Sequence, residues 1–156
     1  MTARVYPPVT IARQFKFVRE TLGPNRGVFV EAFQRIGDGK PGDSWCADFV
    51  SAVLWISYQG PSPLPRTGSC AVMYETAKQM GYLTDSPEPG DVFFRVDRSE
   101  DHAHHVGFVT SVAPDAIGTI AGNTSEDGLS ANGTGVFEHD VAPSPSLAFV
   151  RLPESV

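Results

Sequence analysis

Apolar residues recur with helical spacing through the first half of the chain. In each segment they lie three or four positions apart and therefore share one face of a helix. A glycine follows each segment, as is common where helices end. We predict four helices, which cover residues 10–22, 29–36, 45–58 and 69–80.

The pattern changes after Gly81 to short alternating or β-branched runs, which clusters of Pro, Gly, Asp and Asn separate. We predict five strands there, at residues 92–96, 105–112, 117–123, 135–139 and 147–152. Helices followed by a run of strands are typical of an α+β fold with an antiparallel sheet. The prolines between Gln59 and Arg66 exclude a helix and predict an exposed loop or groove wall.

Length and composition indicate one compact domain over residues 1–156. The chain is 41% hydrophobic and 19% charged, as in an ordinary globular protein. A net charge of −6 without any Lys/Arg cluster argues against nucleic-acid binding, which depends on cationic groups. No apolar run approaches the roughly 18 to 20 residues of a membrane span, so we expect no membrane partner. The N-terminus contains no readable export signal.

Two cysteines, Cys46 and Cys70, each fall near the start of a predicted helix. Two are too few for a disulfide framework, and a chain of this length does not require one. For Cys70 we favour a small buried apolar residue over a bridge to Cys46. Cys46 lies in a first helical turn, capped by Asp43 or Ser44, where the helix macrodipole favours a nucleophilic thiolate.

A hairpin between the second and third predicted strands supplies partners for this thiolate. If residues 113–115 form a three-residue loop, Val112 pairs with Ala116. The same register places His105 opposite Asn123, and cross-strand neighbours lie about 5 Å apart. The asparagine is then within reach of the imidazole.

Small residues in the same hairpin leave room for the helix that carries Cys46. The register pairs Gly107 with Ala121, and we expect the first turn of that helix to pack over them. Sulfur and imidazole would then meet, which predicts a relay of Cys46, His105 and Asn123 of the papain-like kind.

Four motifs in this order resemble the CHAP family of cysteine, histidine-dependent amidohydrolases and peptidases. They are Asp43-Ser-Trp-Cys46-Ala-Asp-Phe-Val-Ser51, Pro89-Gly-Asp-Val92, His105-Val-Gly-Phe-Val109 and Ala121-Gly-Asn123. The resemblance covers nearly the whole chain. It implies a papain-like α+β fold, in which N-terminal helices pack on a C-terminal antiparallel β-sheet, and hydrolysis of amide bonds in bacterial peptidoglycan.

The resemblance also assigns roles to individual residues. Cys46 aligns with the nucleophile, His105 with the base, and Asn123 with the residue that orients the imidazole. Many CHAP domains have a glutamate where this chain has Ala121, so the orienting role falls to Asn123 alone. The implied activity is that of an N-acetylmuramoyl-L-alanine amidase or an endopeptidase, as in phage endolysins and bacterial wall hydrolases. The Cys46 N–H and a donor from the preceding loop would hold the oxyanion.

Other functions stay open on the sequence alone. One is a catalytically inactive CHAP-like module that binds wall fragments or a partner protein, and another is a cysteine protease or transferase that acts on proteins. The expected substrate is the stem peptide or cross-bridge of peptidoglycan. Further expected partners are a larger phage or secretion assembly, or an immunity protein. Such a hydrolase would be made in the cytoplasm and would act on the cell wall after phage-, holin- or secretion-dependent delivery.

The sequence predicts no metal ion or other cofactor. Some CHAP domains bind calcium just upstream of the cysteine, where this chain has only Asp38 and Asp43. Calcium prefers roughly six to eight oxygen ligands. The histidine-rich segment from Asp101 to His105 lacks the ligand spacing of a zinc site.

The remaining candidates are aromatic or ionisable side chains near these motifs. Trp45, beside the nucleophile, is assigned to substrate binding, whereas Trp55 is assigned to the core. Asp48 and Asp91 are assigned to caps or turns, and His139 to the surface.

Overall fold

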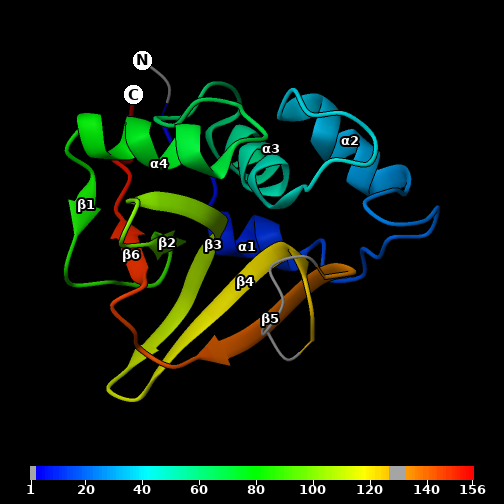
Figure 1. Ribbon diagram of the computed structural model, residues 1–156. Coiled ribbons are helices and arrows are strands. Elements are labelled where there is room, and N and C mark those ends of the chain that lie inside the picture. Colours follow the sequence, from blue (N-terminus) through cyan, green and yellow to red (C-terminus); the bar gives the residue numbers. More distant parts are fainter. Residues whose placement is uncertain (1–2, 127–132) are drawn as a thin grey trace.

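The computed structural model describes residues 3–126 and 133–156, in which four helices precede and cover a six-stranded sheet (Figure 1). The helices are α1 (Pro8–Arg13), α2 (Val28–Ile36), α3 (Cys46–Tyr58) and α4 (Cys70–Gln79). The strands are β1 (Leu83–Thr84), β2 (Val92–Asp97), β3 (His102–Ala113), β4 (Ala116–Thr124), β5 (Gly135–Val141) and β6 (Leu147–Val150). The predicted α+β fold, with N-terminal helices on a C-terminal antiparallel sheet, is confirmed.

The sheet has the strand order β1-β6-β2-β3-β4-β5, and every neighbouring pair is antiparallel. All five predicted strands are present. The strand β1 has two residues, too few to show any period in the sequence. The two ends of the chain also meet, because Ala3 bridges Ser155 and the Arg4 N–H donates to the Glu154 carbonyl.

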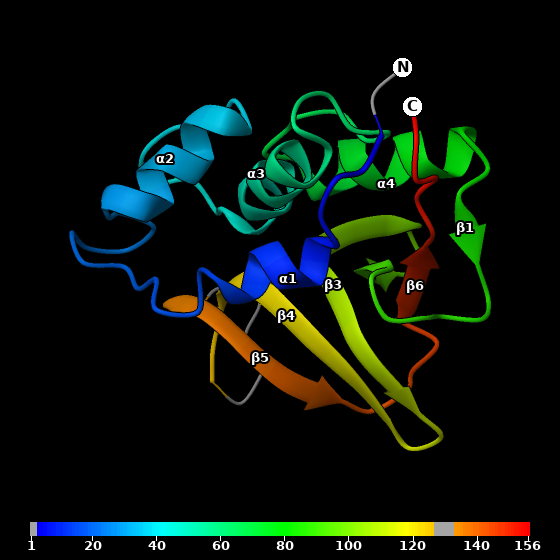
Figure 2. The same ribbon diagram turned by 180° about the vertical axis from the view of Figure 1, so that it is seen from behind.

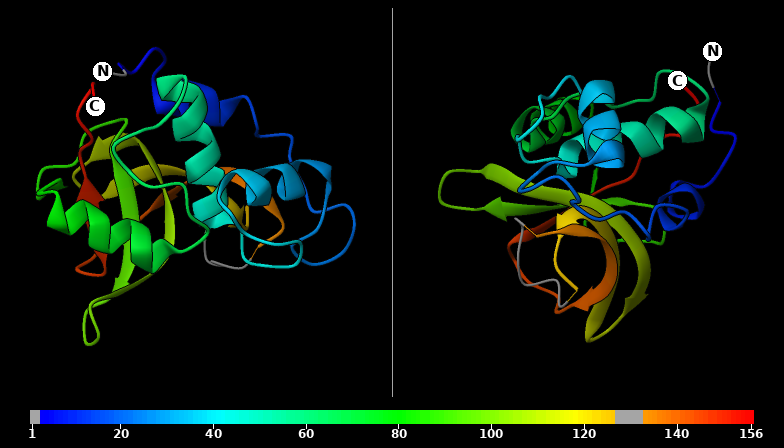
Figure 3. Two further views of the ribbon diagram at one scale, coloured as in Figure 1. Left: turned by 90° about the horizontal axis from the view of Figure 1, so that it is seen from above. Right: turned by 90° about the vertical axis from the view of Figure 1, so that its right-hand side faces the viewer.

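The two faces of the sheet bury different clusters of side chains. One face packs beneath the helices and forms the main core, which includes Phe49 of α3 and Phe108 of β3. Figure 2 shows α1 lying across β3 and β4, both of which it contacts. The sheet curls strongly (Figure 3), and its other face encloses a smaller cluster that contains Phe93 and Ala121. Among the described residues, no helix combines the length and apolarity needed to cross a membrane.

The first helix is shorter than its hydrophobic pattern predicts. α1 ends at Arg13, and the chain then turns toward β5, where the Val136 N–H donates to the Val18 carbonyl. Val18 is buried, as the pattern predicts, whereas Leu22 is 59% exposed. Backbone pairing with β5 therefore replaces the helical hydrogen bonds, and tertiary contacts override the local period.

The other helices begin and end close to the predicted residues. α2 stops at Gly37, and α3 stops at Gln59, which adopts a left-handed φ of 54°. The Ser69 hydroxyl caps α4 by accepting the Val72 N–H at 3.1 Å. Cys46 and Cys70 are consequently the first residues of α3 and α4.

The β3–β4 hairpin differs from the predicted register next to its turn. Ala113 pairs with Ala116, so the loop has two residues and Val112 lies opposite Ile117. An irregularity between Val109 and Ser111 then shifts the register by one residue. Beyond it the predicted register holds, as at Phe108, which pairs with Ile120. A bulge has therefore compensated for the shorter loop.

Candidate active site

The N-terminus of α3 carries no side-chain cap. The N-cap position is Trp45, whose side chain accepts no N–H of the first turn, and no other described side chain is recorded as doing so. The predicted caps are wrong, since the Asp43 carboxylate accepts the Lys40 N–H instead and Ser44 lies one residue before the cap. The positive end of a 13-residue helix thus remains available beside Cys46.

Trp45 is a core residue. Its side chain is fully buried, its ring stacks on Phe33 at a centroid distance of 6.1 Å, and its Nε1 donates to the Glu20 carboxylate at 3.0 Å. A substrate contact, as predicted for Trp45, does not fit this burial, and we assign the ring to positioning the start of α3. Burial of so large an apolar ring stabilises the fold more than exposure at a substrate site would.

The close approach of α3 to the sheet occurs at Gly122. A Cβ on Gly122 would lie 2.7 Å from Trp45 Cζ3 and 2.8 Å from Phe49 Cβ. The predicted packing of this helix over Gly107 and Ala121 is wrong. Those two residues do adjoin each other, but they lie with Phe93 on the other face of the sheet. Successive residues of a strand point to opposite faces of the sheet, so α3 packs over Gly122 and not over its neighbour Ala121.

His105 is buried in β3, with 2% of its surface exposed. It pairs with Arg95 of β2, next to a register shift that leaves His104 as an extra residue in β3. The imidazole packs against the Phe93 ring at 6.0 Å. The buried Nδ1 has no hydrogen bond of standard geometry within the part of the chain that the structure describes.

Asn123 is fully buried near the end of β4. Its φ of 54° is in the left-handed region, and the register of β4 with β5 shifts between Ala121 and Thr124. The backbone pairs of β3 and β4 extend to Phe108 and Ile120, three residues short of the predicted pair of His105 with Asn123. The contact between that imidazole and the amide therefore stays a prediction.

The sulfur atoms of Cys46 and Cys70 are in contact. Their Sγ–Sγ distance is 3.3 Å, and neither cysteine is in a disulfide. Cys46 is 4% exposed and Cys70 is half-buried. The sequence assigned Cys70 to the apolar core, and it missed this contact because the two residues belong to different helices. Their shared position at a helix start was the one available signal.

The surroundings of Cys46 favour its thiolate. The hydrogen bond from Cys70 has the largest effect and, with the hydrogen bond and charge of His105 and the Val106 N–H, holds the pKa of Cys46 well below its ordinary value. Burial acts in the opposite direction. The pKa of the Cys70 thiol is raised well above its ordinary value, first by that same hydrogen bond and then by burial. Of the two sulfurs, Cys46 is thus the one that ionises first, with Cys70 as the hydrogen-bond donor.

The family model of the CHAP domain matches residues 37–123, more than half of the chain, and includes Cys46, His105 and Asn123. This chain belongs to the CHAP domain family. Membership implies a hydrolase of the cysteine- and histidine-dependent amidase or peptidase type, a group associated with peptidoglycan. A comparison with curated proteins found no match.

Asp48, in the first turn of the CHAP helix α3, is a buried carboxylate. It is fully buried, and neither oxygen has a hydrogen-bond partner among the described residues. Three glycines enclose it, because a Cβ on any of them would lie within 3.0 Å of an Asp48 oxygen: Gly37, Gly39 and Gly68. Burial, and secondarily the charges of Cys46 and two nearby aspartates, raises its pKa to about 7. The predicted cap or turn role is wrong for Asp48.

The side chains considered as metal ligands are dispersed in the described part of this CHAP domain. Within residues 3–126 and 133–156, no three His, Cys, Asp or Glu side chains gather in a position to hold a metal ion. Asp43, upstream of the cysteine, is engaged with the Lys40 N–H. His102 and His104 are exposed on β3.

Three further candidates have structural positions. Asp91 fulfils the predicted turn role, since its carboxylate accepts the Glu88 N–H, and it also binds Arg151 at 2.8 Å. Trp55 is only partly buried, with the Arg66 guanidinium 4.4 Å from its ring centre. His139 is half-buried in β5 rather than fully on the surface.

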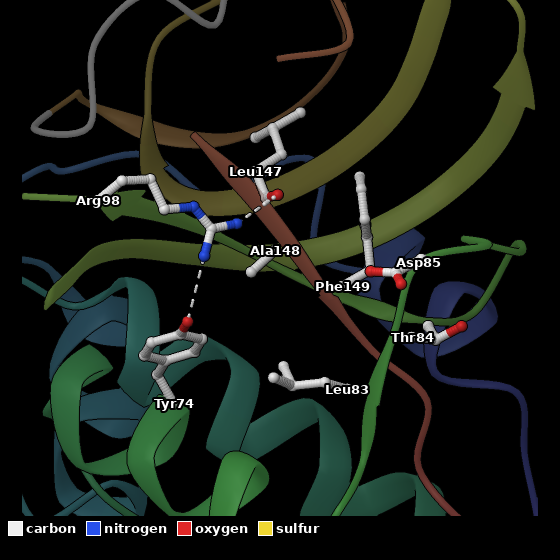
Figure 4. Close-up of a pocket in the computed structure, with 8 residues that line it drawn as sticks. All are labelled: Tyr74, Leu83, Thr84, Asp85, Arg98, Leu147, Ala148 and Phe149. Carbon is white, nitrogen blue, oxygen red and sulfur yellow. Dashed lines mark hydrogen bonds between the residues drawn. The ribbon is translucent and has the colours of Figure 1, made fainter. Parts of the chain in front are cut away.

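A cavity of about 240 Å³ lies between α4, β1 and β6 (Figure 4), outside the Cys46 site. The Arg98 guanidinium borders it but is engaged, since it donates to the Tyr74 hydroxyl and the Leu147 carbonyl. None of the residues that line this cavity is Cys46, His105 or Asn123. We assign the cavity no part in the chemistry.

Proposed function

We propose that the protein is a peptidoglycan hydrolase, an N-acetylmuramoyl-L-alanine amidase or an endopeptidase, that cleaves amide bonds of cell-wall peptide. The observation that carries the proposal is the environment of Cys46. A buried sulfur at the start of a long helix lies 3.3 Å from the Cys70 sulfur, and Cys70, His105 and the Val106 N–H together lower its pKa. A lowered pKa favours the thiolate, which is the nucleophilic form of cysteine.

Acylation begins when the Cys46 thiolate attacks the carbonyl carbon of the scissile amide. The carbonyl oxygen becomes an oxyanion, which the Cys46 N–H can receive because no side chain caps this end of α3. His105 gives its proton to the leaving amine, the C–N bond breaks, and a thioester with Cys46 remains.

Deacylation reverses the proton transfer. His105, now neutral, takes a proton from a water molecule, and the resulting hydroxide attacks the thioester. The carboxyl product leaves and the thiolate returns. Asn123 is proposed to hold the imidazole in the orientation that both steps require, as the asparagine does in papain-like relays.

Arg95 is suited to recognise the substrate beside this relay. It is half-buried, lies directly across the β2–β3 pair from His105, and has no ion pair or side-chain hydrogen bond among the described residues. A guanidinium binds a carboxylate through two parallel hydrogen bonds. Peptidoglycan stem peptides carry free carboxylates, and we propose that Arg95 binds one of them.

The alternative is a CHAP module that binds wall fragments without cleaving them. One observation favours it, since Cys46 and His105 are 4% and 2% exposed, and the Cys70 sulfur lies against the nucleophile. A substrate must displace these neighbours before attack occurs. The retained Cys46, His105 and Asn123 favour the hydrolase, because a binding module has no use for an ionised thiol.

Digestion of purified peptidoglycan tests the proposal. We expect the wild-type protein to release muropeptides whose masses identify the cleaved amide, and Cys46→Ala to release none while its circular dichroism spectrum is unchanged. Iodoacetamide should label Cys46 faster than it labels a free cysteine, and the advantage should persist below neutral pH. Slow labelling together with intact peptidoglycan would show that the protein is not this hydrolase.

A further inference from the structure

The two cysteine sulfurs are placed for a reaction with each other. Cys46 Sγ and Cys70 Sγ are 3.3 Å apart, across 24 positions of the sequence, and both are free thiols. A disulfide bond measures about 2.05 Å, so a shift of less than about 1 Å by each sulfur would form one.

The environments of the two sulfurs differ in a way that suits oxidation. Cys46 is the ionised sulfur, and thiolates rather than thiols react with peroxides. Cys70 retains its proton and is half-buried, so small solutes can approach the pair from its side. Reactive cysteines that sense peroxide commonly lie beside a second cysteine of this kind.

We propose that Cys46 and Cys70 form a dithiol that hydroperoxides convert into an internal disulfide, which reversibly blocks the Cys46 sulfur. The Cys46 thiolate attacks one oxygen of the peroxide and the O–O bond breaks. Hydroxide is the leaving group, and Cys46 becomes a sulfenic acid. The hydroxide removes the Cys70 proton and becomes water.

The second step closes the bond. The Cys70 sulfur attacks the Cys46 sulfur, the S–O bond breaks, and a second hydroxide leaves. This hydroxide takes a proton from solvent, which replaces the proton that Cys46 lost when it ionised. Together the two cysteines lose two electrons, and one hydrogen peroxide is reduced to two water molecules. Because Cys70 is already in contact, this step precedes a second attack by peroxide, and Cys46 escapes irreversible oxidation to the sulfinic acid.

The loss of hydrolysis rests on the proposed function, whereas the formation of the disulfide does not. With Cys46 in a disulfide, no thiolate is available to attack an amide, and reduction by a dithiol returns it. The chain contains no other cysteine, so any internal disulfide joins this pair.

The test is to treat the folded full chain with a small excess of hydrogen peroxide and follow the intact mass. We expect a monomer lighter by two hydrogens that no longer reacts with iodoacetamide, and recovery of two reactive thiols with dithiothreitol. Peptidoglycan hydrolysis should be lost when the disulfide forms and should return when dithiothreitol reduces it. In Cys70→Ser, peroxide should instead add oxygen atoms to Cys46, and in Cys46→Ala the remaining thiol should stay reduced under the same treatment.

Each other outcome contradicts the proposal. A monomer with oxygen added to Cys46 and a free Cys70 thiol would show that the pair does not close. Unchanged thiols or a disulfide-linked dimer would equally overturn it. If the internal disulfide forms but the reduced protein leaves peptidoglycan intact, the proposed dithiol is supported and the proposed hydrolase activity is wrong.

Discussion

The buried carboxylate of Asp48 should make the stability of the protein depend on pH in an unusual direction. The folded protein holds the Asp48 pKa at about 7, against an ordinary value of 3.8. The folded state therefore binds this proton more tightly than the unfolded state. The resulting stabilisation is complete below the ordinary pKa and is lost as the pH rises through about 7.

The structure sets the size of this effect. One pKa unit corresponds to about 1.4 kcal/mol, so raising the pH from 5 to 8 removes up to roughly 3 kcal/mol. Asp48 lies beneath a short surface loop, and screening by its water reduces the value to about 2 kcal/mol. In Asp48→Asn the buried group cannot ionise. We expect wild type to lose about 2 kcal/mol more than this variant over that range.

Urea unfolding at pH 5 and pH 8, followed by tryptophan fluorescence, measures the difference. The ionisation of Cys46 also contributes in this range, so both proteins should be compared again in a Cys46→Ala background. Asp115→Asn is the matched control, because Asp115 is an exposed acid in the turn between β3 and β4 and is not among the charges that raise the Asp48 pKa. If the stability gap between wild type and Asp48→Asn is the same at both pH values, Asp48 does not titrate there and the reasoning is wrong.

Three further predictions concern close contacts and substrate binding. Gly122→Ala should lower the free energy of unfolding in urea by about 1–3 kcal/mol and reduce peptidoglycan hydrolysis, because its Cβ would meet the start of α3. Gly118→Ala is the control in the same strand. Its Cβ would meet hydroxyls that can rotate, so the activity should be unchanged. Equal losses of activity in both variants would contradict this account. Arg95→Gln should raise KM for muropeptides with a free carboxylate far more than for their amidated forms, with kcat little changed; an equal effect on both substrates would exclude carboxylate binding. Gly68→Ala should cost about 1–2 kcal/mol in wild type and little in Asp48→Ala, since the clash is with that carboxylate; an unchanged cost would show another cause.

Local patterns were sufficient for most of the architecture. Helical spacing located α2, α3 and α4, because each places apolar side chains in the core and a glycine lies at or just after each helix end. It failed at α1, where the chain turns to pair with β5. The predicted hairpin register was also recovered at Phe108, though only because a bulge near Thr110 offsets the shorter turn.

The sequence by itself determined the order of the elements, the four motifs and the position of Cys46 at the start of a helix, since all of these follow from residues close together in the chain. Only the tertiary structure decided that Cys70 touches Cys46, that Trp45 is buried, and that Asp48 is enclosed without a partner. These facts depend on which helix ends and glycine-containing loops meet in space. No local period encodes such meetings, because the residues involved belong to different helices and loops.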